Sequence, residues 1–135
     1  MLSAIGRPPN TSDMGLEKSG IKVKPKSGLI EVDEFENTSR EGIYAIGDVT
    51  GKVNLTPVAV RAGRILSERL FNSRPTLKMN YENVATVVFS HPPIGKLGLT
   101  ESEAIKKFGE DRVKVYKSQF TNMFFSLPDP NENHR

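Results

Sequence analysis

The hydrophobic residues of the chain fall in short runs separated by glycine, proline and polar clusters. Residues 43–46 form one such apolar run, which predicts a buried strand covered on both faces and ended by Gly47. Thr56 is a suitable N-cap and Pro57 suits the first helical position, so the pattern predicts a helix that continues to about Leu70. This strand, turn and helix are the feature around which the rest of the chain is organised.

The segments before this feature carry weaker signals of secondary structure. The elements expected there are a strand over 2–5, a short helix capped by Asp13 and ended at Gly20, and a hairpin in which 21–23 and 29–35 flank a turn at Lys26–Gly28.

A polar segment over 72–76 follows the predicted helix, and its Pro75 prevents further helix. We therefore expect a domain boundary there, with domains over 1–74 and 75–135. The first elements expected beyond it are a strand over 84–89 and a stiff loop at His91–Pro93, for whose X-Pro bonds the sequence leaves both the cis and the trans form open. A helix from a Thr100–Glu103 capping box to Gly109, a strand from 113 toward 120, and a polar turn over 128–133 are expected after them. The strand–helix–strand order predicts an α+β domain.

Composition and charge exclude several classes of function. The net charge of +3 over 135 residues comes from intermixed charges, so the clustered basic surface that nucleic acid or a membrane surface requires is missing. No apolar stretch is long enough to span a membrane, and no basic-then-apolar leader is present. We therefore expect a soluble, cytoplasmic protein. A mitochondrial location is the alternative, because a missing N-terminal segment would remove any targeting signal.

The chain contains no cysteine, which excludes a disulfide framework, a thiolate metal site and dithiol chemistry by this chain alone. Its two histidines, His91 and His134, lie far apart in the sequence, so a local histidine metal motif is also absent. The chain begins directly in an apolar segment and ends in a polar turn. This pattern is typical of an internal piece of a longer protein.

Gly47 and Asp48 lie where the predicted strand ends, at the edge where open α/β sheets bind their ligands. Glycine allows close approach, a carboxylate accepts hydrogen bonds from hydroxyls, and a nearby helix N-terminus favours an electron-rich group. The residues alone leave a second interpretation open, in which these positions form an ordinary turn and an ordinary helix cap.

Three segments carry a resemblance to a known family. Residues 42–64 resemble the second flavin-binding segment of the pyridine-nucleotide disulfide oxidoreductases, and residues 4–11 resemble the signature that precedes it. Residues 86–95, with 98–101 after them, are similar to the opening of the interface domain in the glutathione-reducing members. The resemblance implies an α/β fold: the end of the FAD/NAD(P)-binding two-dinucleotide-domain fold, followed by the start of an α+β interface, or dimerisation, domain.

The resemblance also implies roles for single residues. Gly47, Asp48 and Thr56 would bind FAD, Gly6, Asn54 and Val87 would bind NADPH, and Arg64 would contact glutathione disulfide. Taken without the family, Gly6 would merely end a strand and Arg64 would be a solvated charge. Asn54 departs from the apolar or acidic residue usual at its position, so a backbone contact is expected there. His91 is not the family's catalytic histidine, and no catalytic residue or metal ligand is assigned.

The implied function is that of a fragment of an FAD-dependent, NADPH-dependent glutathione-disulfide reductase that is a homodimer when full length. One alternative is a trypanothione reductase or a dihydrolipoamide dehydrogenase. Another is a non-catalytic truncated product that at most binds full-length subunits. Because the redox cysteines and the family's catalytic His-Pro-Thr motif are both missing, we expect this chain alone to be inactive.

Overall fold

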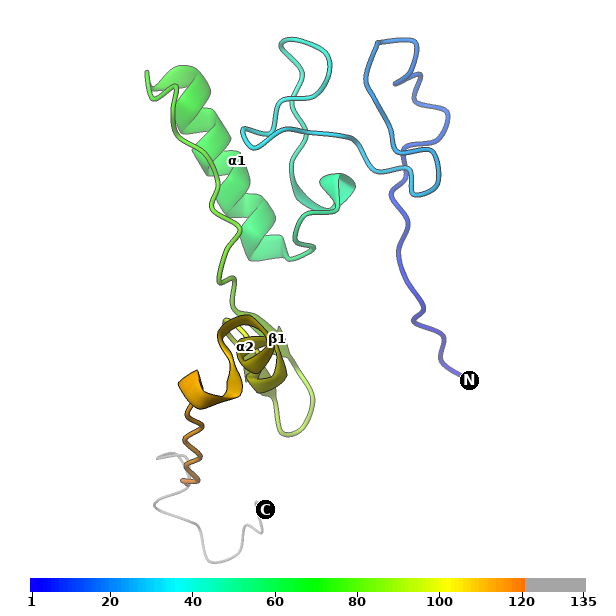
Figure 1. Ribbon diagram of the computed structural model, residues 1–135. Coiled ribbons are helices and arrows are strands. Elements are labelled where there is room, and N and C mark those ends of the chain that lie inside the picture. The colour runs from blue at the N-terminus through cyan, green and yellow to red at the C-terminus, as the bar shows by residue number, and fades with distance from the viewer. Residues whose placement is uncertain (121–135) are drawn as a thin grey trace, which may run out of the picture. The chain divides into compact units, whose positions relative to one another are not determined.

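A computed structural model of the protein describes residues 1–120. The chain divides into two compact units, one over Met1–Val84 and one from Ala85 onward (Figure 1). In the described part, the elements are η1 (Gly47–Thr50), α1 (Thr56–Phe71), β1 (Thr86–Val88), β2 (Ile94–Lys96), α2 (Glu101–Phe108) and η2 (Glu110–Arg112). The two 3-10 helices, η1 and η2, are single turns. The polar turn predicted over 128–133 and His134 lie outside the described residues.

The core of the first unit forms on one face of α1. Val58, Ala62 and Met79 are buried together, and Ala62 is only 1% exposed. Six partly buried side chains pack around them: Ile46, Val53, Leu55, Ile65, Tyr81 and Val84. Small residues on this face of the helix allow the close packing, because a Cβ at Gly63 would lie 3.1 Å from Ile46 Cδ1. In Figure 1, α1 runs in green beside the segment that carries η1.

The helix predicted from Thr56 to about Leu70 is confirmed as α1, with Pro57 in its first turn. The predicted cap is wrong, because Thr56 is the first helical residue and Leu55 is the N-cap, without a side-chain hydrogen bond. The Leu55 carbonyl accepts the amides of Val58 and Ala59, both at 3.0 Å. The Leu55 side chain packs against the buried cluster, so hydrophobic packing rather than side-chain capping determines where the helix begins.

The predicted hairpin before α1 is present as an antiparallel bridge between Val23 and Ile30. The predicted buried strand over 43–46 is wrong in extent, because it is reduced to one bridge between Tyr44 and Asn37. Ala45 is buried, but Ile43 is exposed. A strand covered on both faces needs neighbours on both sides, and among residues 1–120 it pairs only with the segment around Asn37.

Three other predicted elements are absent from the described structure. The segments 2–5 and 113–116 form no strand, and the segment 13–20 forms turns rather than a helix. Asp13 has a positive φ of 59°, which a helix start does not allow. Leu2 and Ile5 are fully exposed, with no strand beside them in the described part of the chain. An apolar, β-branched segment becomes a strand only where a hydrogen-bonding partner is available.

The second unit contains the antiparallel pair β1–β2, in which Val87 lies opposite Gly95. The strand predicted over 84–89 is thus confirmed at its centre. In the connecting loop, the His91–Pro92 bond, whose form the sequence left open, is cis. The capping box is confirmed. Thr100 Oγ1 accepts from the Glu103 amide at 3.3 Å, and Glu103 Oε2 accepts from the Thr100 amide at 2.8 Å. Gly109, with a φ of 91°, ends α2 as predicted.

The segment between α1 and β1 packs on the first unit. Met79 is buried in the core, Lys78 forms an ion pair with Glu34, and Tyr81 donates a hydrogen bond to Glu36. The compact first unit therefore extends to Val84. The domain boundary expected near Pro75 stays a prediction.

Candidate cofactor site

A hollow of about 480 Å³ in the first unit brings together residues that are far apart in the sequence. Its lining includes Asp48 and Asn54, together with Arg7, which follows Gly6. The remaining lining residues are Pro8, Pro9, Asn10, Leu29 and Val49. Asp48 and Asn54, both predicted to bind a cofactor, thus line the same hollow as Arg7, the residue next to Gly6.

Two contacts hold this hollow together. Thr11 Oγ1 donates to the Gly28 carbonyl at 2.7 Å and ties the N-terminal segment to the hairpin turn. The Ile30 amide donates to the Val49 carbonyl at 3.0 Å and ties the returning side of the hairpin to η1. The hairpin therefore bridges the segment that carries Gly6 and the turn that carries Asp48.

Position 47 requires glycine because η1 packs closely against α1 there. Its φ of 73° lies in the left-handed region, and a Cβ there would lie 3.1 Å from Ala59 Cβ of α1. The position therefore needs both an unusual backbone conformation and a close approach of η1 to α1. Asp48 is exposed and lines the hollow, so its carboxylate is available to accept hydrogen bonds from hydroxyl groups.

Thr56 begins α1 and is exposed. Its backbone N–H is one of the first amides of the helix, which have no acceptor within the helix, and the helix dipole makes this end partially positive. An electron-rich group on a ligand could accept from it. Asp48 and Thr56 thus offer an acceptor and a donor on either side of the short loop 51–55.

The other predicted site residues lie elsewhere. Gly6 is exposed, with a φ of 142°, and a Cβ at this position would meet no atom within 4 Å. Arg64 is exposed on α1 and lines a different hollow, together with Arg61 and Arg74. Val87 belongs to β1 of the second unit, whereas Gly6 and Asn54 belong to the first unit.

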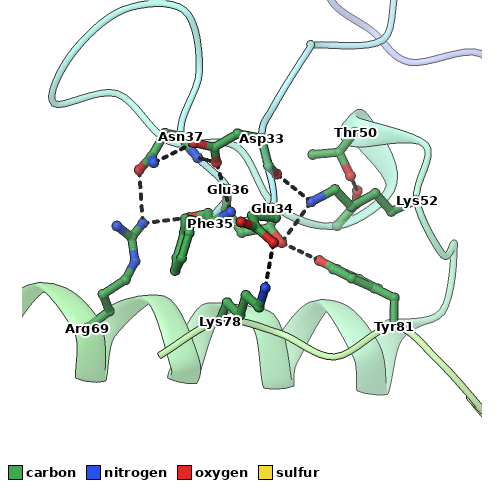
Figure 2. A network of polar contacts seen from close by, with 11 residues as sticks. Asp33, Glu34, Phe35, Glu36, Asn37, Thr50, Lys52, Arg69, Lys78 and Tyr81 are labelled. Atoms are coloured by element: carbon green, nitrogen blue, oxygen red, sulfur yellow. Dashed lines mark hydrogen bonds and ion pairs between the residues drawn. The ribbon is translucent and has the colours of Figure 1, made fainter. Parts of the chain in front are cut away.

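Glu36 is the centre of a buried polar network that the sequence pattern does not reveal (Figure 2). It is 3% exposed, and its Oε1 accepts from Lys52 Nζ at 3.1 Å and from the Tyr81 hydroxyl at 2.8 Å. Lys52 also donates to the Asp33 carbonyl at 2.8 Å. Glu36 Oε2 is buried and has no hydrogen-bond partner among residues 1–120. The ion pair with Lys52 is therefore the main interaction that offsets the cost of burying this carboxylate.

The network extends to α1 through Arg69, whose guanidinium donates to the Phe35 carbonyl and to Asn37 Oδ1 (Figure 2). Although partial burial raises the pKa of Asp33, hydrogen bonds from Asn37 and Phe35 lower it below its usual value overall. For Tyr81, burial and the neighbouring Glu36 carboxylate both raise the pKa. Because Lys52 lies in loop 51–55, the network fixes the loop that joins Asp48 to Thr56.

Arg7, Asn10 and Glu36 are the residues that reasoning from the sequence missed. Arg7 and Asn10 stand in the segment 4–11 that carries the family resemblance, so that segment was the available signal for the lining of the hollow. For Glu36 no local signal exists, because its partners come from positions 52 and 81.

In the part of the chain that the structure describes, no three acidic or histidine side chains are grouped to hold a metal ion. No helix among residues 1–120 is both long enough and apolar enough to cross a membrane.

Comparison with known proteins defines the class of protein. Residues 1–63 match the family model described as pyridine nucleotide-disulphide oxidoreductase, and residues 84–134 match the model of that family's dimerisation domain. The chain belongs to the pyridine nucleotide-disulphide oxidoreductase family. The predicted fold class, the end of the dinucleotide-binding fold followed by the start of a dimerisation domain, is confirmed.

The chain is similar in sequence, in structure or in both to particular known proteins. The chain is 46% identical over 127 residues to a glutathione reductase of Schizosaccharomyces pombe, and the match covers 94% of this chain but 27% of the relative. It is 32% identical, with a TM-score of 0.71, to the structure of a Cu(II) complex of the HOCl-induced flavoprotein disulfide reductase RclA from Escherichia coli, covering 78% of this chain and 24% of that one. Another structure of RclA gives a TM-score of 0.68 at 33% identity, covering 76% of this chain and 23% of that one. The chain thus spans about a quarter of the length of these proteins.

Proposed function

We propose that this chain is part of an FAD- and NADPH-dependent enzyme that reduces glutathione disulfide to glutathione in the cytoplasm. The observation that carries the proposal is the placement of Asp48 in a hollow beside the segment after Gly6, with the N-terminus of α1 a few residues further on. The 46% identity to a glutathione reductase supports the choice of substrate. Trypanothione reductase and dihydrolipoamide dehydrogenase activities are the alternatives within the family.

The residues present fit one part of a flavin. Asp48 would accept hydrogen bonds from the ribityl hydroxyls, and the Thr56 N–H would bind a carbonyl oxygen of the flavin ring. The positive end of α1 would favour negative charge on that ring. When bound, FAD would supply the redox chemistry, as the acceptor of a hydride and the carrier of its two electrons. The protein's contribution, from Gly47 to Thr56, is to orient the cofactor and to provide the local charge.

The other assignments are part of the same proposal. Gly6, Asn54 and Val87 would contact NADPH, with Asn54 acting through its backbone, and Arg64 would contact glutathione disulfide. Arg64 is exposed, so its guanidinium is available to an anionic ligand.

We also propose that the chain by itself lacks disulfide-reductase activity. Reduction of a disulfide by this family's chemistry needs a dithiol, and the 135 residues contain no cysteine. NADPH oxidation by the purified chain with glutathione disulfide and added FAD is expected to equal the rate without protein. A protein-dependent rate above that background would contradict the proposal.

Flavin binding is tested by titrating FAD into the isotope-labelled chain and following the backbone amide signals by NMR. We expect concentration-dependent shifts at Gly47, Asp48 and Thr56, and a loss of the effect in Asp48→Ala. Asp111→Ala is a matched control, because it removes an exposed carboxylate from η2 of the second unit. Equal shifts in Asp48→Ala and in the unmodified chain would contradict the assignment of Asp48.

A second candidate function is a non-catalytic one, in which this chain pairs with longer subunits through its dimerisation segment. The match of residues 84–134 to the dimerisation domain favours it, as does the exposure of apolar side chains on and next to β1, with Phe89 88% exposed. Co-expression of a tagged chain with the same protein extended on both sides would test it. Absence of a mixed species in size-exclusion chromatography would contradict it.

A further inference from the structure

A second hollow in the first unit, of about 340 Å³, lies along α1 and is rich in arginine. Its charged lining consists of Arg61, Arg64, Arg74 and Glu68. Its apolar lining consists of Pro57, Val60, Ile65 and Leu77. The hollow therefore has an apolar surface and an excess of positive charge.

Arg61 and Arg64 stand three positions apart on α1, so their side chains are neighbours on the helix surface. Two like charges at this spacing destabilise a helix slightly. Neither arginine forms an ion pair within residues 1–120, where the four ion pairs involve other cations. An anion placed between the two guanidinium groups would remove their repulsion and gain charge-assisted hydrogen bonds.

Arg74 reaches the hollow from the segment after α1 and is the third cation. Its contact with Glu68 is long, at 3.8 Å, and both side chains are largely exposed, at 62% and 46%. An exposed ion pair of this kind contributes little to stability. Arg74 can therefore exchange Glu68 for the carboxylate of a ligand at little cost.

The apolar lining distinguishes between kinds of anion. Inorganic phosphate would leave Val60, Ile65 and Leu77 in contact with water. A small organic molecule with carboxylates at both ends of a carbon chain would cover these side chains and reach the arginines at the same time. Charge complementarity favours a ligand whose carboxylates outnumber its cationic groups.

We propose that this hollow is a binding site for a small organic polycarboxylate, in which Arg61 and Arg74 join Arg64 in holding the carboxylates. Glutathione disulfide has this chemistry, so the inference rests in part on the proposed function, which gives that ligand to Arg64. The new elements are Arg61 and Arg74, which would make the site selective for the charge of the substrate rather than for its disulfide.

The test is an NMR titration of the labelled chain with glutathione disulfide, with the guanidinium N–H signals of Arg61, Arg64 and Arg74 as the readout. We expect all three to shift together, and Arg61→Gln or Arg74→Gln to weaken binding by roughly five- to tenfold, the loss of one charge-assisted contact. Glutamine and arginine have similar helix propensity, so Arg61→Gln should fold normally. Arg40→Gln is the matched control: it removes the same charge from an exposed position that does not line the hollow.

Two further ligands complete the experiment. Glutathione disulfide with its carboxylates esterified should not shift the arginine signals, and inorganic phosphate should bind more weakly than the peptide. Equal binding of phosphate would overturn the proposal and indicate a non-selective anion surface. Retained binding by the ester, or equal weakening in Arg40→Gln and Arg61→Gln, would also overturn it.

The two titrations distinguish a failure of this binding site from a failure of the proposed function. FAD-induced shifts at Asp48 without any ligand effect at Arg61 would leave the flavin assignment in place and remove this site. Binding of the polycarboxylate without FAD-induced shifts would leave this site in place and remove the flavin assignment.

Discussion

The Tyr81 hydroxyl donates a 2.8 Å hydrogen bond to Oε1 of Glu36, a residue 45 positions earlier in the chain (Figure 2). The same oxygen accepts from Lys52 at 3.1 Å. One buried carboxylate thus joins the hairpin segment, the loop between η1 and α1, and the segment that leads to the second unit. Removal of one partner should therefore destabilise the contacts among all three segments.

Tyr81→Phe should lower the free energy of unfolding by about 1.5–3 kcal/mol, because it removes a hydrogen bond to a charged acceptor that is almost fully buried. Urea denaturation measures the change. Tyr116→Phe is the matched control, since Tyr116 is exposed and its loss should change stability by less than about 0.5 kcal/mol. Equal effects of the two substitutions would show that the Glu36 contact contributes nothing specific.

Lys52→Met should destabilise the chain more than Tyr81→Phe. It leaves the Glu36 carboxylate buried without its cation, which costs about 3–5 kcal/mol for a fully buried pair and less here because Lys52 is partly exposed. It also removes the Lys52 ammonium from above the Tyr81 ring, 5.0 Å from its centroid. The double variant Glu36→Gln, Lys52→Met should recover part of the loss in a double-mutant cycle. Strictly additive effects would contradict coupling between the two charges.

Gly47→Ala should lower stability by about 1–3 kcal/mol, because alanine must adopt a positive φ there and its Cβ meets Ala59 Cβ at 3.1 Å. Gly42→Ala is the control for the effect of the positive φ alone. Gly42 has a similar φ of 76°, but a Cβ there would meet no atom within 4 Å. Thermal unfolding should therefore show a larger loss for Gly47→Ala. Equal losses would mean that η1 moves away from α1 without cost.

Glu103 should titrate below the usual range of a glutamate. Hydrogen bonds from the Thr100 amide and hydroxyl lower its pKa, with a further contribution from the charge of Lys96. A carboxylate whose pKa is lower in the folded state stabilises that state fully above its unfolded pKa, and this contribution is lost as the pH falls through the folded value. The protection factors of the α2 amides, which compare observed with intrinsic exchange at the same pH, should accordingly fall in acid.

NMR titration of the Glu103 side chain checks this prediction, and Thr100→Val, which keeps the shape but removes the hydroxyl, should raise the pKa part of the way back. An unchanged Glu103 titration in Thr100→Val would assign the effect to the amide and to Lys96 alone.

Features that depend on neighbouring residues could be predicted from the sequence. The capping box at Thr100, the stop at Gly109 and the start of α1 near Pro57 follow from local hydrogen bonding and from the fixed φ of proline, so they could be predicted. The family resemblance likewise depends on short contiguous motifs. It pointed correctly to the class of protein and to the order of its two parts.

The long-range partners of each segment, in contrast, follow from the folded structure and not from the local sequence. The apolar segments at 2–5 and 43–46 look alike as candidate strands, but pairing requires a partner in space, which the sequence pattern does not contain. Leu55 replaces Thr56 as the cap because of a hydrophobic contact made elsewhere in the core. The hollow at Asp48, the arginine-rich hollow on α1 and the burial of Glu36 depend on side chains that only folding brings together.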